Sequence, residues 1–406
     1  MLDLFQCAPD RMITDHSHGR LDAMNKRPIR VLHVVSRMHR AGVETWLMHL
    51  LRHADRSEYQ MDFLVHSEEP AHYDAEIRAL GSKQLFAAPL RRVMRYRAHV
   101  KHLLRDHPPY DIVHSHLDCF GGYPLRCAAE AGIPVRIAYM HVDLAAYVSH
   151  LRWSLQVYSR YSQSLVRRYG TLGISVTKDA GRPLFAQWGR PWRTLSYGID
   201  LGPLRPTRTR SNARAEFGIP DGVIVIGHAG RFAEQKNHTK FVEITEAIRR
   251  KTDKFHVVLA GDGPLRQEIE REVVRRGLSK HVAFVGVRAD IPRLLTSLFD
   301  VVLFPSLFEG NPVFITEAQA AGCPVVMSNT IAREADLVPE VLTRLPLSLS
   351  ADKWADAVLE VGRRRRSPKD QLAAHETVVN SPMNILRSTE SLLSLYRQSC
   401  VSRRAA

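Results

Sequence analysis

The stretch from Ser306 to Val326 reads S-L-F-E-G-N-P-V-F-I-T-E-A-Q-A-A-G-C-P-V-V. A short apolar strand ends at Pro305, a polar loop follows, and an amphipathic helix then runs to a stop at Gly322. A second apolar run begins directly after the helix. Strand, helix and strand in this order form the repeating unit of a parallel sheet covered by helices. The stretch therefore predicts an α/β fold.

The same alternation runs through both halves of the chain. Short apolar strands are expected at 29–35, 61–66, 111–116 and 135–140, and again at 223–230, 256–261, 282–286, 300–305 and 324–328. A Pro- and Arg-rich stretch at 203–214 separates the two series, and 406 residues suit two domains. We predict a flexible tail at 1–27, one Rossmann-like domain at 28–200, a second at 201–380, and a closing helix and tail at 381–406.

Composition narrows the class of protein. The chain is 45% hydrophobic, and it has no apolar run long enough to cross a bilayer. Residues 1–27 resemble neither a signal peptide nor a membrane anchor. The five cysteines are odd in number and scattered, which predicts a reducing cytoplasm without a disulfide framework or zinc site. The net charge of +15 would attract nucleic acid, anionic lipid or an anionic substrate.

The loop from Glu309 to Pro312 is a candidate phosphate site. It includes Gly310 and Asn311, and the helix after it opens with Val313 and Phe314. The first N–H groups of a helix have no intrahelical acceptor and favour a phosphate.

Two carboxylates belong to the same stretch. Glu317 follows Glu309 by eight residues, so the pair can hold two ends of an extended ligand such as a nucleotide sugar. The alternative is a capping glutamate followed by a solvated one.

Two cations follow the first strand of the second half, in G-H-A-G-R-F-A-E-Q-K-N at 227–237. Arg231 and Lys236 lie where doubly wound sheets bind ligands, and together they can neutralise a diphosphate. Two ordinary surface cations are the alternative. Gly263 ends the next strand loop as a turn or as a close backbone approach to a ligand. Val287 and Arg288 end a further strand, where their backbone could meet a nucleobase or form an ordinary loop.

Together these motifs resemble the GT-B fold glycosyltransferases of family 4, especially the exopolysaccharide and capsule biosynthesis members. The resemblance extends from about Pro28 to about Arg397. It rests on H-V-V-S-R-M with G-V-E-T-W, G-R-F-x-E-Q-K-N-H, G-D-G-P-L-R, F-P-S-L-F-E-G-x-P and E-A-Q-A-A-G. It implies two facing Rossmann-like domains, the first on the acceptor side and the second binding the donor.

The resemblance also implies roles for single residues. Arg231 and Lys236 would hold the donor diphosphate, Glu317 the ribose and Glu309 the donor sugar. His141 would face the transferred sugar, so the predicted catalytic residues are Glu309, His141, Arg231 and Lys236. Gly42 would approach the phosphates from the first domain. Two departures stand out: Ala41-Gly42 where many members have two glycines, and S-Y-G-I-D at 196–200 where many have P-N-G-I-D.

The activity that the resemblance implies is retaining transfer of a hexose without a metal. The donor would be a nucleotide sugar, with UDP favoured over GDP, and the acceptor a glycan or a polyprenyl-diphosphate-linked sugar. The chain has no D-x-D motif, and the H-x-H pair of His114 and His116 lacks a recognisable third ligand. Three alternatives stay open: a nucleotide-sugar epimerase on the same fold, a basic nucleic-acid-binding protein, and a catalytically silent partner in a polysaccharide assembly complex.

The segment 89–105 predicts a basic amphipathic helix. Its apolar stripe contains Val93, Tyr96, Val100, Leu103 and Leu104, and arginines and Lys101 lie largely outside this stripe. Such a helix could contact anionic lipid at the inner face of the membrane, or it could pack on its own domain with a solvated basic face.

Overall fold

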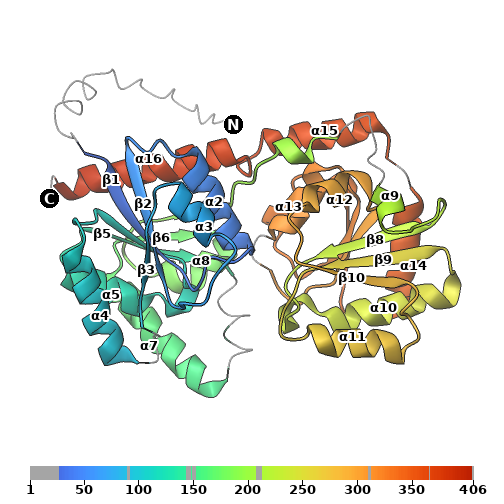
Figure 1. Ribbon diagram of the computed structural model, residues 1–406, viewed down its shortest axis with the longest axis horizontal. Coiled ribbons are helices and arrows are strands. Elements are labelled where there is room, and N and C mark those ends of the chain that lie inside the picture. Colours follow the sequence, from blue (N-terminus) through green and yellow to red (C-terminus); the bar gives the residue numbers. More distant parts are fainter. Residues whose placement is uncertain are drawn as a thin grey trace, which may run out of the picture.

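The computed structural model describes residues 27–88, 92–142, 148, 152–206, 213–309, 312–364 and 366–404. The predicted tail therefore lies outside the described residues, except for Arg27. Two α/β domains lie side by side, each built on its own sheet (Figure 1). Every strand pairing within the two sheets is parallel. The predicted pair of Rossmann-like domains is confirmed.

The first domain contains a seven-stranded sheet of order β3-β2-β1-β4-β5-β6-β7. Its strands are β1 (Ile29–Val34), β2 (Tyr59–Val65), β3 (Gln84–Phe86), β4 (Ile112–Ser115), β5 (Val135–Met140), β6 (Leu172–Ser175) and β7 (Trp192–Thr194). Its helices are α2 (Gly42–His53), α3 (Asp74–Ala79), α4 (Val93–Asp106), α5 (Gly122–Glu130), α7 (Trp153–Tyr169) and α8 (Lys178–Phe185), with a 3-10 turn η1 (Asp118–Phe120).

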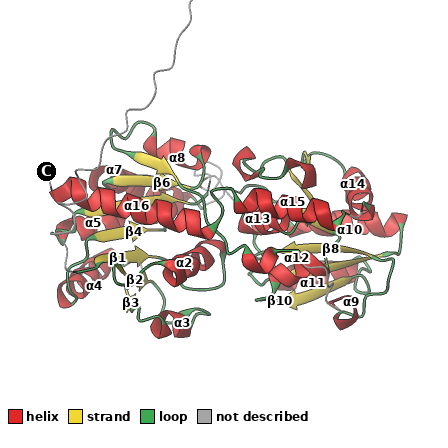
Figure 2. Ribbon diagram, turned by 90° about the horizontal axis from the view of Figure 1, so that it is seen from above, coloured by secondary structure: helices red, strands yellow, loops and turns green. Residues whose placement is uncertain are grey.

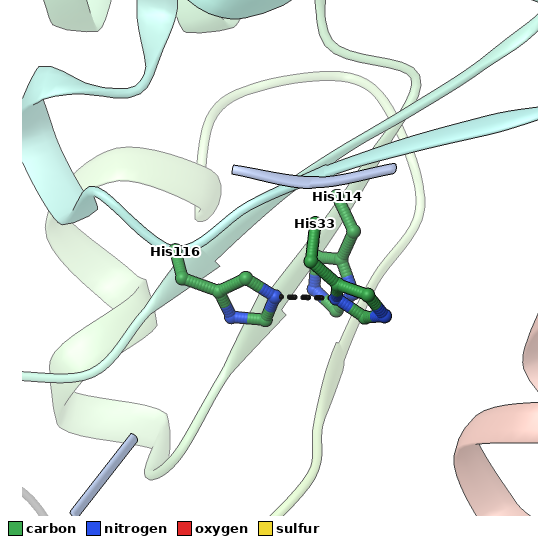
Figure 3. A group of neighbouring side chains, drawn as sticks. All are labelled: His33, His114 and His116. Carbon is green, nitrogen blue, oxygen red and sulfur yellow. Dashed lines mark hydrogen bonds between the residues drawn. The ribbon is translucent and has the colours of Figure 1, made fainter. Parts of the chain in front are cut away.

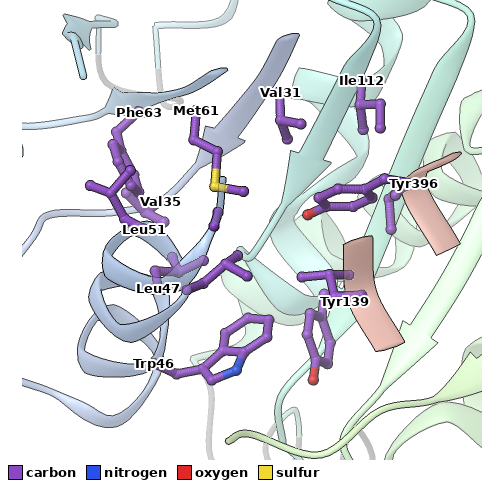
Figure 4. Close-up of a cluster of buried hydrophobic side chains, with 14 of the residues drawn as sticks. Val31, Val35, Trp46, Leu47, Leu51, Met61, Phe63, Ile112, Tyr139 and Tyr396 are labelled. Carbon is purple, nitrogen blue, oxygen red and sulfur yellow. The ribbon is translucent and has the colours of Figure 1, made fainter. Parts of the chain in front are cut away.

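Alternate residues of the central strands feed two separate apolar layers. Val31 and Val35 point toward α2, where Trp46 and Leu47 cover them (Figure 4). Leu32 and Val34 point to the opposite face, toward α4, α5 and α7. Both faces of the sheet are therefore covered, as the continuous apolar runs of a parallel sheet require.

The second domain contains a six-stranded sheet of order β10-β9-β8-β11-β12-β13. Its strands are β8 (Ile224–Ala229), β9 (Phe255–Ala260), β10 (Val282–Gly286), β11 (Val301–Phe304), β12 (Val325–Ser328) and β13 (Leu342–Leu345). Its helices are α9 (Ala213–Glu216), α10 (His238–Lys251), α11 (Arg266–Arg275), α12 (Ile291–Ser297), α13 (Val313–Ala320), α14 (Ala351–Arg363) and α15 (Pro368–Val379); 3-10 turns are η2 (Gly202–Leu204), η3 (Glu234–Lys236), η4 (Arg333–Ala335) and η5 (Pro339–Val341).

The last helix, α16 (Ile385–Arg404), returns to the first domain (Figure 2). Leu392 and Tyr396 are fully buried in the layer that also contains Trp46. The hydroxyl of Tyr59 on β2 donates a hydrogen bond of 3.1 Å to the carbonyl of Leu393. The two domains are thus joined twice along the chain, and the predicted closing helix completes the core of the first domain.

The predicted basic helix forms as α4. Its residues Tyr96 and Val100 are buried in the first domain, and Arg97 forms a 2.7 Å ion pair with Glu130. Packing on its own domain therefore uses the apolar stripe, and residues 89–91 lie outside the described residues. Among the helices of the described ranges, none combines the length and the apolar character that a membrane span needs.

Candidate active site

Two loops at the carboxyl edge of the second sheet form one unit. The first follows β8 and the second follows β11, which are neighbouring strands. The amide of Leu307 donates to the carbonyl of Gln235 at 2.8 Å, and the side-chain amide of Asn237 donates to the carbonyl of Pro305 at 3.1 Å. Asn237 also caps α10, because its side chain accepts from the amide of Lys240. The two predicted donor-binding loops are therefore held in fixed relation.

Lys236 and Glu309 meet between these loops. The Nζ of Lys236 lies 2.5 Å from Oε1 of Glu309, and the Nε2 of Gln235 donates to Oε2 at 3.1 Å. The side chains of Lys236 and Glu309 are only 17% and 8% exposed. Lys236 also lies 4.9 Å from the centre of the Phe304 ring. A cation and a carboxylate held this closely, with little exposure, form one preorganised charged group.

Arg231 faces the first domain. It is exposed, and its positive charge acts on two groups across the gap, Glu44 of α2 and His39. Burial raises the pKa of the Glu44 carboxyl to about 7, and the Arg231 charge opposes this shift. Arg231 is therefore placed to reach an anion between the domains.

Two helix N-termini face each other across the same gap. A Cβ on Gly42, the first residue of α2, would lie 3.6 Å from Cγ2 of Val313, the first residue of α13. Ala41 and Pro312 are the respective N-caps, and neither side chain closes its helix with a hydrogen bond. The first N–H groups of both helices are therefore oriented toward one space, where their partial positive charges add.

Glu317 lies one turn into α13 and is half-buried. Burial raises the pKa of its carboxyl to about 7. The predicted amphipathic character of this helix is wrong, since Phe314, Ile315, Ala318 and its other apolar residues lie almost entirely in the core. Val313 and Glu317 are the two residues of α13 that are partly exposed. They are four residues apart, so Glu317 lies on the side of the helix where Val313 meets Gly42.

Two predicted donor contacts, Gly263 and Arg288, have other interactions in the fold. A Cβ on Gly263 would lie 2.5 Å from the carbonyl oxygen of Phe232, so loop packing alone requires glycine here. The guanidinium of Arg288 contacts Asp290 at 2.7 and 2.8 Å. Val287 is 42% exposed, so it stays accessible to a ligand. Gly310 and Asn311 lie outside the described residues.

His141 is enclosed in the first domain. It is 5% exposed; its Nδ1 is hydrogen-bonded to the hydroxyl of Tyr197 and its Nε2 to Nδ1 of His116 at 3.3 Å. Nε2 of His116 then lies 3.0 Å from Nδ1 of His33 (Figure 3). Both ring nitrogens of His141 are thus engaged by protein groups. Its predicted contact with the sugar would require these hydrogen bonds to rearrange.

His33 is the third member of a buried imidazole cluster with His114 and His116 (Figure 3). The sequence pattern missed it because His33 pairs with His114 only through the register of β1 and β4. Burial lowers the pKa of His33 to about 3 and that of His114 and His116 well below the usual range, so the rings are neutral. Nδ1 of His33 is hydrogen-bonded to Nε2 of His116, and Nδ1 of His114 lies 2.6 Å from the hydroxyl of Tyr396 on α16, so the rings contact other protein groups. We therefore assign the cluster to the packing of the first domain.

Three residues near the gap were not predicted. Gln235 fixes Glu309, although it lies within the quoted motif. Glu44 belongs to G-V-E-T-W and has the raised pKa described above. Burial raises the pKa of Asp118 to about 7, and its Oδ1 accepts from the amide of His141 at 2.5 Å. No spacing rule separates these carboxyls from ordinary surface ones, because their burial depends on the tertiary fold.

Comparison with known proteins agrees with this arrangement. Residues 40–202 match the family described as Glycosyltransferase Family 4, and residues 209–362 match Glycosyl transferases group 1. The chain is 32% identical over 379 residues to EpsF of Bacillus subtilis, named as a glycosyltransferase; the match covers 92% of this chain and 97% of EpsF. It is 28% identical over 228 residues to UDP-Gal:alpha-D-GlcNAc-diphosphoundecaprenol alpha-1,3-galactosyltransferase of Escherichia coli, covering 54% of this chain and 58% of that enzyme.

Solved structures show the same fold. HepE of Anabaena, crystallised with UDP and glucose, superimposes with a TM-score of 0.74 at 18% identity. The superposition covers 90% of this chain and 99% of HepE.

Proposed function

Because the chain belongs to the group 1, family 4 glycosyltransferases, we propose that it moves a hexose from a nucleotide sugar to a glycan or lipid-linked acceptor, with retention of configuration. The observation that carries the proposal is the Lys236–Glu309 pair at the sheet edge that also carries Arg231, where α13 begins and meets the N-terminus of α2. Such a group of cations and N–H donors suits a diphosphate next to a hydroxyl-rich sugar.

The names of similar proteins support the choice of substrates. The Escherichia coli relative is named for a UDP-galactose donor and a diphosphoundecaprenol acceptor, and HepE was crystallised with UDP and glucose. We therefore favour UDP over GDP as the nucleotide. A lipid-linked acceptor would place this enzyme in the cytoplasm at the inner face of the membrane, in exopolysaccharide or capsule synthesis.

The proposed chemistry needs stabilisation of the leaving group. As the bond between the sugar C1 and the diphosphate oxygen breaks, negative charge grows on that oxygen. Arg231, Lys236 and the N-terminus of α13 would stabilise this charge without a bound metal. Glu309 would accept hydrogen bonds from the sugar hydroxyls, and Glu317 from the ribose diol.

The acceptor oxygen forms its bond to C1 on the face that the diphosphate leaves. Its proton passes to the departing phosphate oxygen, so no protein base is required. Glu44 is the competing proton acceptor, because its pKa of about 7 suits a general base. Turnover by Glu44→Gln with unchanged donor affinity would support the phosphate route. Loss of turnover in that variant, with the donor still bound, would assign the proton to Glu44.

The experiment that tests the function is transfer from UDP- or GDP-hexoses in EDTA, with undecaprenyl-diphosphate-linked sugar as acceptor. Products are identified by mass spectrometry, and their anomeric configuration by NMR. We expect a retained linkage from one donor. Conversion of the donor to another sugar nucleotide without acceptor would indicate an epimerase instead. Binding of arbitrary DNA without any nucleotide-sugar binding would indicate a nucleic-acid-binding protein.

A further inference from the structure

The outer face of α7 carries an apolar stripe that nothing in the described chain covers. Trp153, Val157 and Tyr161 are 78%, 58% and 46% exposed. They are four residues apart and so lie along one side of the helix. The described residues include nine exposed large hydrophobic side chains, and five lie on α4 and α7, namely Met94, Trp153, Leu155, Val157 and Tyr161. Such a concentration on one part of a protein marks an interaction surface.

The inner face of α7 is already fully used. Ser159, Ser162, Leu165 and Val166 are buried against the domain. A Cβ on Gly122 of α5 would lie 2.0 Å from the backbone oxygen of Ser162, so the two helices pack at close range. The exposed stripe is therefore not the side of α7 that packs on the domain. It faces away from the domain.

The charged side chains of α7 itself have one sign. Arg160, Arg167 and Arg168 are exposed on α7, and the helix contains no Asp or Glu. On α4, which packs against the same helix α5 as α7 does, Arg92 and Arg95 are exposed beside Met94. An aromatic and aliphatic stripe bordered by arginines matches the interface of an anionic bilayer, where rings enter the headgroup layer and cations meet lipid phosphates.

The position of α7 leaves this surface accessible. It covers the sheet face opposite to the one that receives α16, and Figure 1 shows the two helices on opposite edges of the first domain. A membrane on the α7 side would not disturb the helix that joins the domains.

We propose that the stripe Trp153–Val157–Tyr161, with its neighbouring arginines, docks this enzyme on the surface of an anionic membrane. The predicted contact through residues 89–105 is thereby moved to α7. The purpose of such docking rests on the proposed transfer to a lipid-linked acceptor, but lipid binding itself does not require that transfer.

The test uses the full chain, without donor, and vesicles of phosphatidylglycerol with phosphatidylcholine. Of the five tryptophans, Trp153 alone is largely exposed, so its fluorescence reports directly on the surface. We expect co-sedimentation with the anionic vesicles, a blue shift of emission that is lost in Trp153→Phe, and little binding to phosphatidylcholine alone.

Two variants and two controls sharpen the result. Trp153→Ser with Val157→Ser should lower the partition coefficient about tenfold, and Arg160→Ala about fivefold. Val274→Ser and Arg271→Ala on α11, an exposed apolar and an exposed basic position in the second domain, should leave it unchanged. All five positions are exposed, so the variants are expected to fold.

Three outcomes would overturn the proposal. The wild type could fail to bind anionic vesicles, it could bind them without a change in Trp153 emission, or it could form dimers that bury Trp153 without lipid. The last outcome would assign the stripe to a second copy of this chain. Nucleotide binding by the same preparations, measured separately, shows whether the proposed transferase site stands in each case.

Discussion

Both sheets are parallel, but different kinds of side chain lie at their carboxyl edges. In the second domain the edge carries partly accessible charges, with Lys236 and Glu309 paired and Arg231 exposed. In the first domain it carries buried neutral rings, where His116 and His141 connect Tyr197 to the interior. The edge of the second domain is suited to bind an anion. The edge of the first domain is suited to form a fixed, uncharged surface opposite it. Changes at the two edges should therefore have different consequences.

The largest effect is expected from Lys236→Ala. Loss of this cation would remove the proposed stabilisation of the leaving diphosphate, so turnover should fall about 100- to 1,000-fold. Steady-state transfer assays measure the effect. Lys251→Ala at the other end of α10 is the matched control, because it breaks a 2.6 Å ion pair with Asp356 without touching the site.

A paired variant separates catalysis from folding. Lys236→Met alone leaves the Glu309 carboxylate, 8% exposed, without its cation. Adding Glu309→Gln should restore the melting temperature but not turnover. Recovery of turnover in the double variant would show that the ion pair only supports the fold.

The next effect concerns pH and Glu317. Its carboxyl has a raised pKa of about 7, so protonation below that pH removes an acceptor for the ribose hydroxyls. Affinity for an intact nucleotide sugar should fall as pH drops through about 7, since the diphosphate diester does not titrate there. Glu317→Gln should bind about tenfold more weakly at high pH and respond less to pH. A wild-type affinity independent of pH would contradict the assignment.

A smaller effect is expected from Tyr197→Phe in the first domain. The lost hydroxyl leaves Nδ1 of His141 buried without its partner, which should lower the free energy of unfolding by about 1–3 kcal/mol. Urea denaturation measures this change, with Tyr161→Phe at an exposed position as control. UDP affinity should stay the same. A parallel loss of affinity would show that this edge of the first domain also contacts the nucleotide.

The smallest effect is a gradual loss of stability in acid. Burial lowers the pKa of His33 and His141 to about 3, so the unfolded chain takes up protons below about 6.5 while the native state does not. The free energy of unfolding should therefore decrease as pH falls from about 6.5 toward 3. Asp118 opposes this trend, because its pKa is raised from 3.8 to about 7 in the native state. Between these two pH values the native state binds a proton that the unfolded chain does not. Hydrogen exchange should show the first domain loosening before the second.

More of the fold than of the candidate site could be predicted from the sequence. Repeated strand and helix patterns were enough to predict two parallel sheets, because each strand is short, apolar and locally bounded. The return of α16 to the first domain was not readable, since the apolar spacing of Leu392 and Leu393 does not say which core they enter. His33 joined His114 only through strand register.

The residues of the candidate site could be predicted from sequence order, but their contacts could not. Arg231 and Lys236 follow β8, and Glu309 and Glu317 follow β11. These are neighbouring parallel strands, so sequence order alone assigns the four residues to one edge of the sheet. The direct contact of Lys236 with Glu309 and the burial of Glu44 and His141 depend on packing between distant segments. These contacts required coordinates.

The most direct test of the donor site is a calorimetric titration with UDP and with GDP in EDTA, on wild type and on Lys236→Ala. We predict that one nucleotide, UDP, binds the wild type and that the variant binds it at least about tenfold more weakly. Failure of well-folded wild type to bind either nucleotide, or equal binding by the variant, would contradict the assignment of the donor to the second domain's edge.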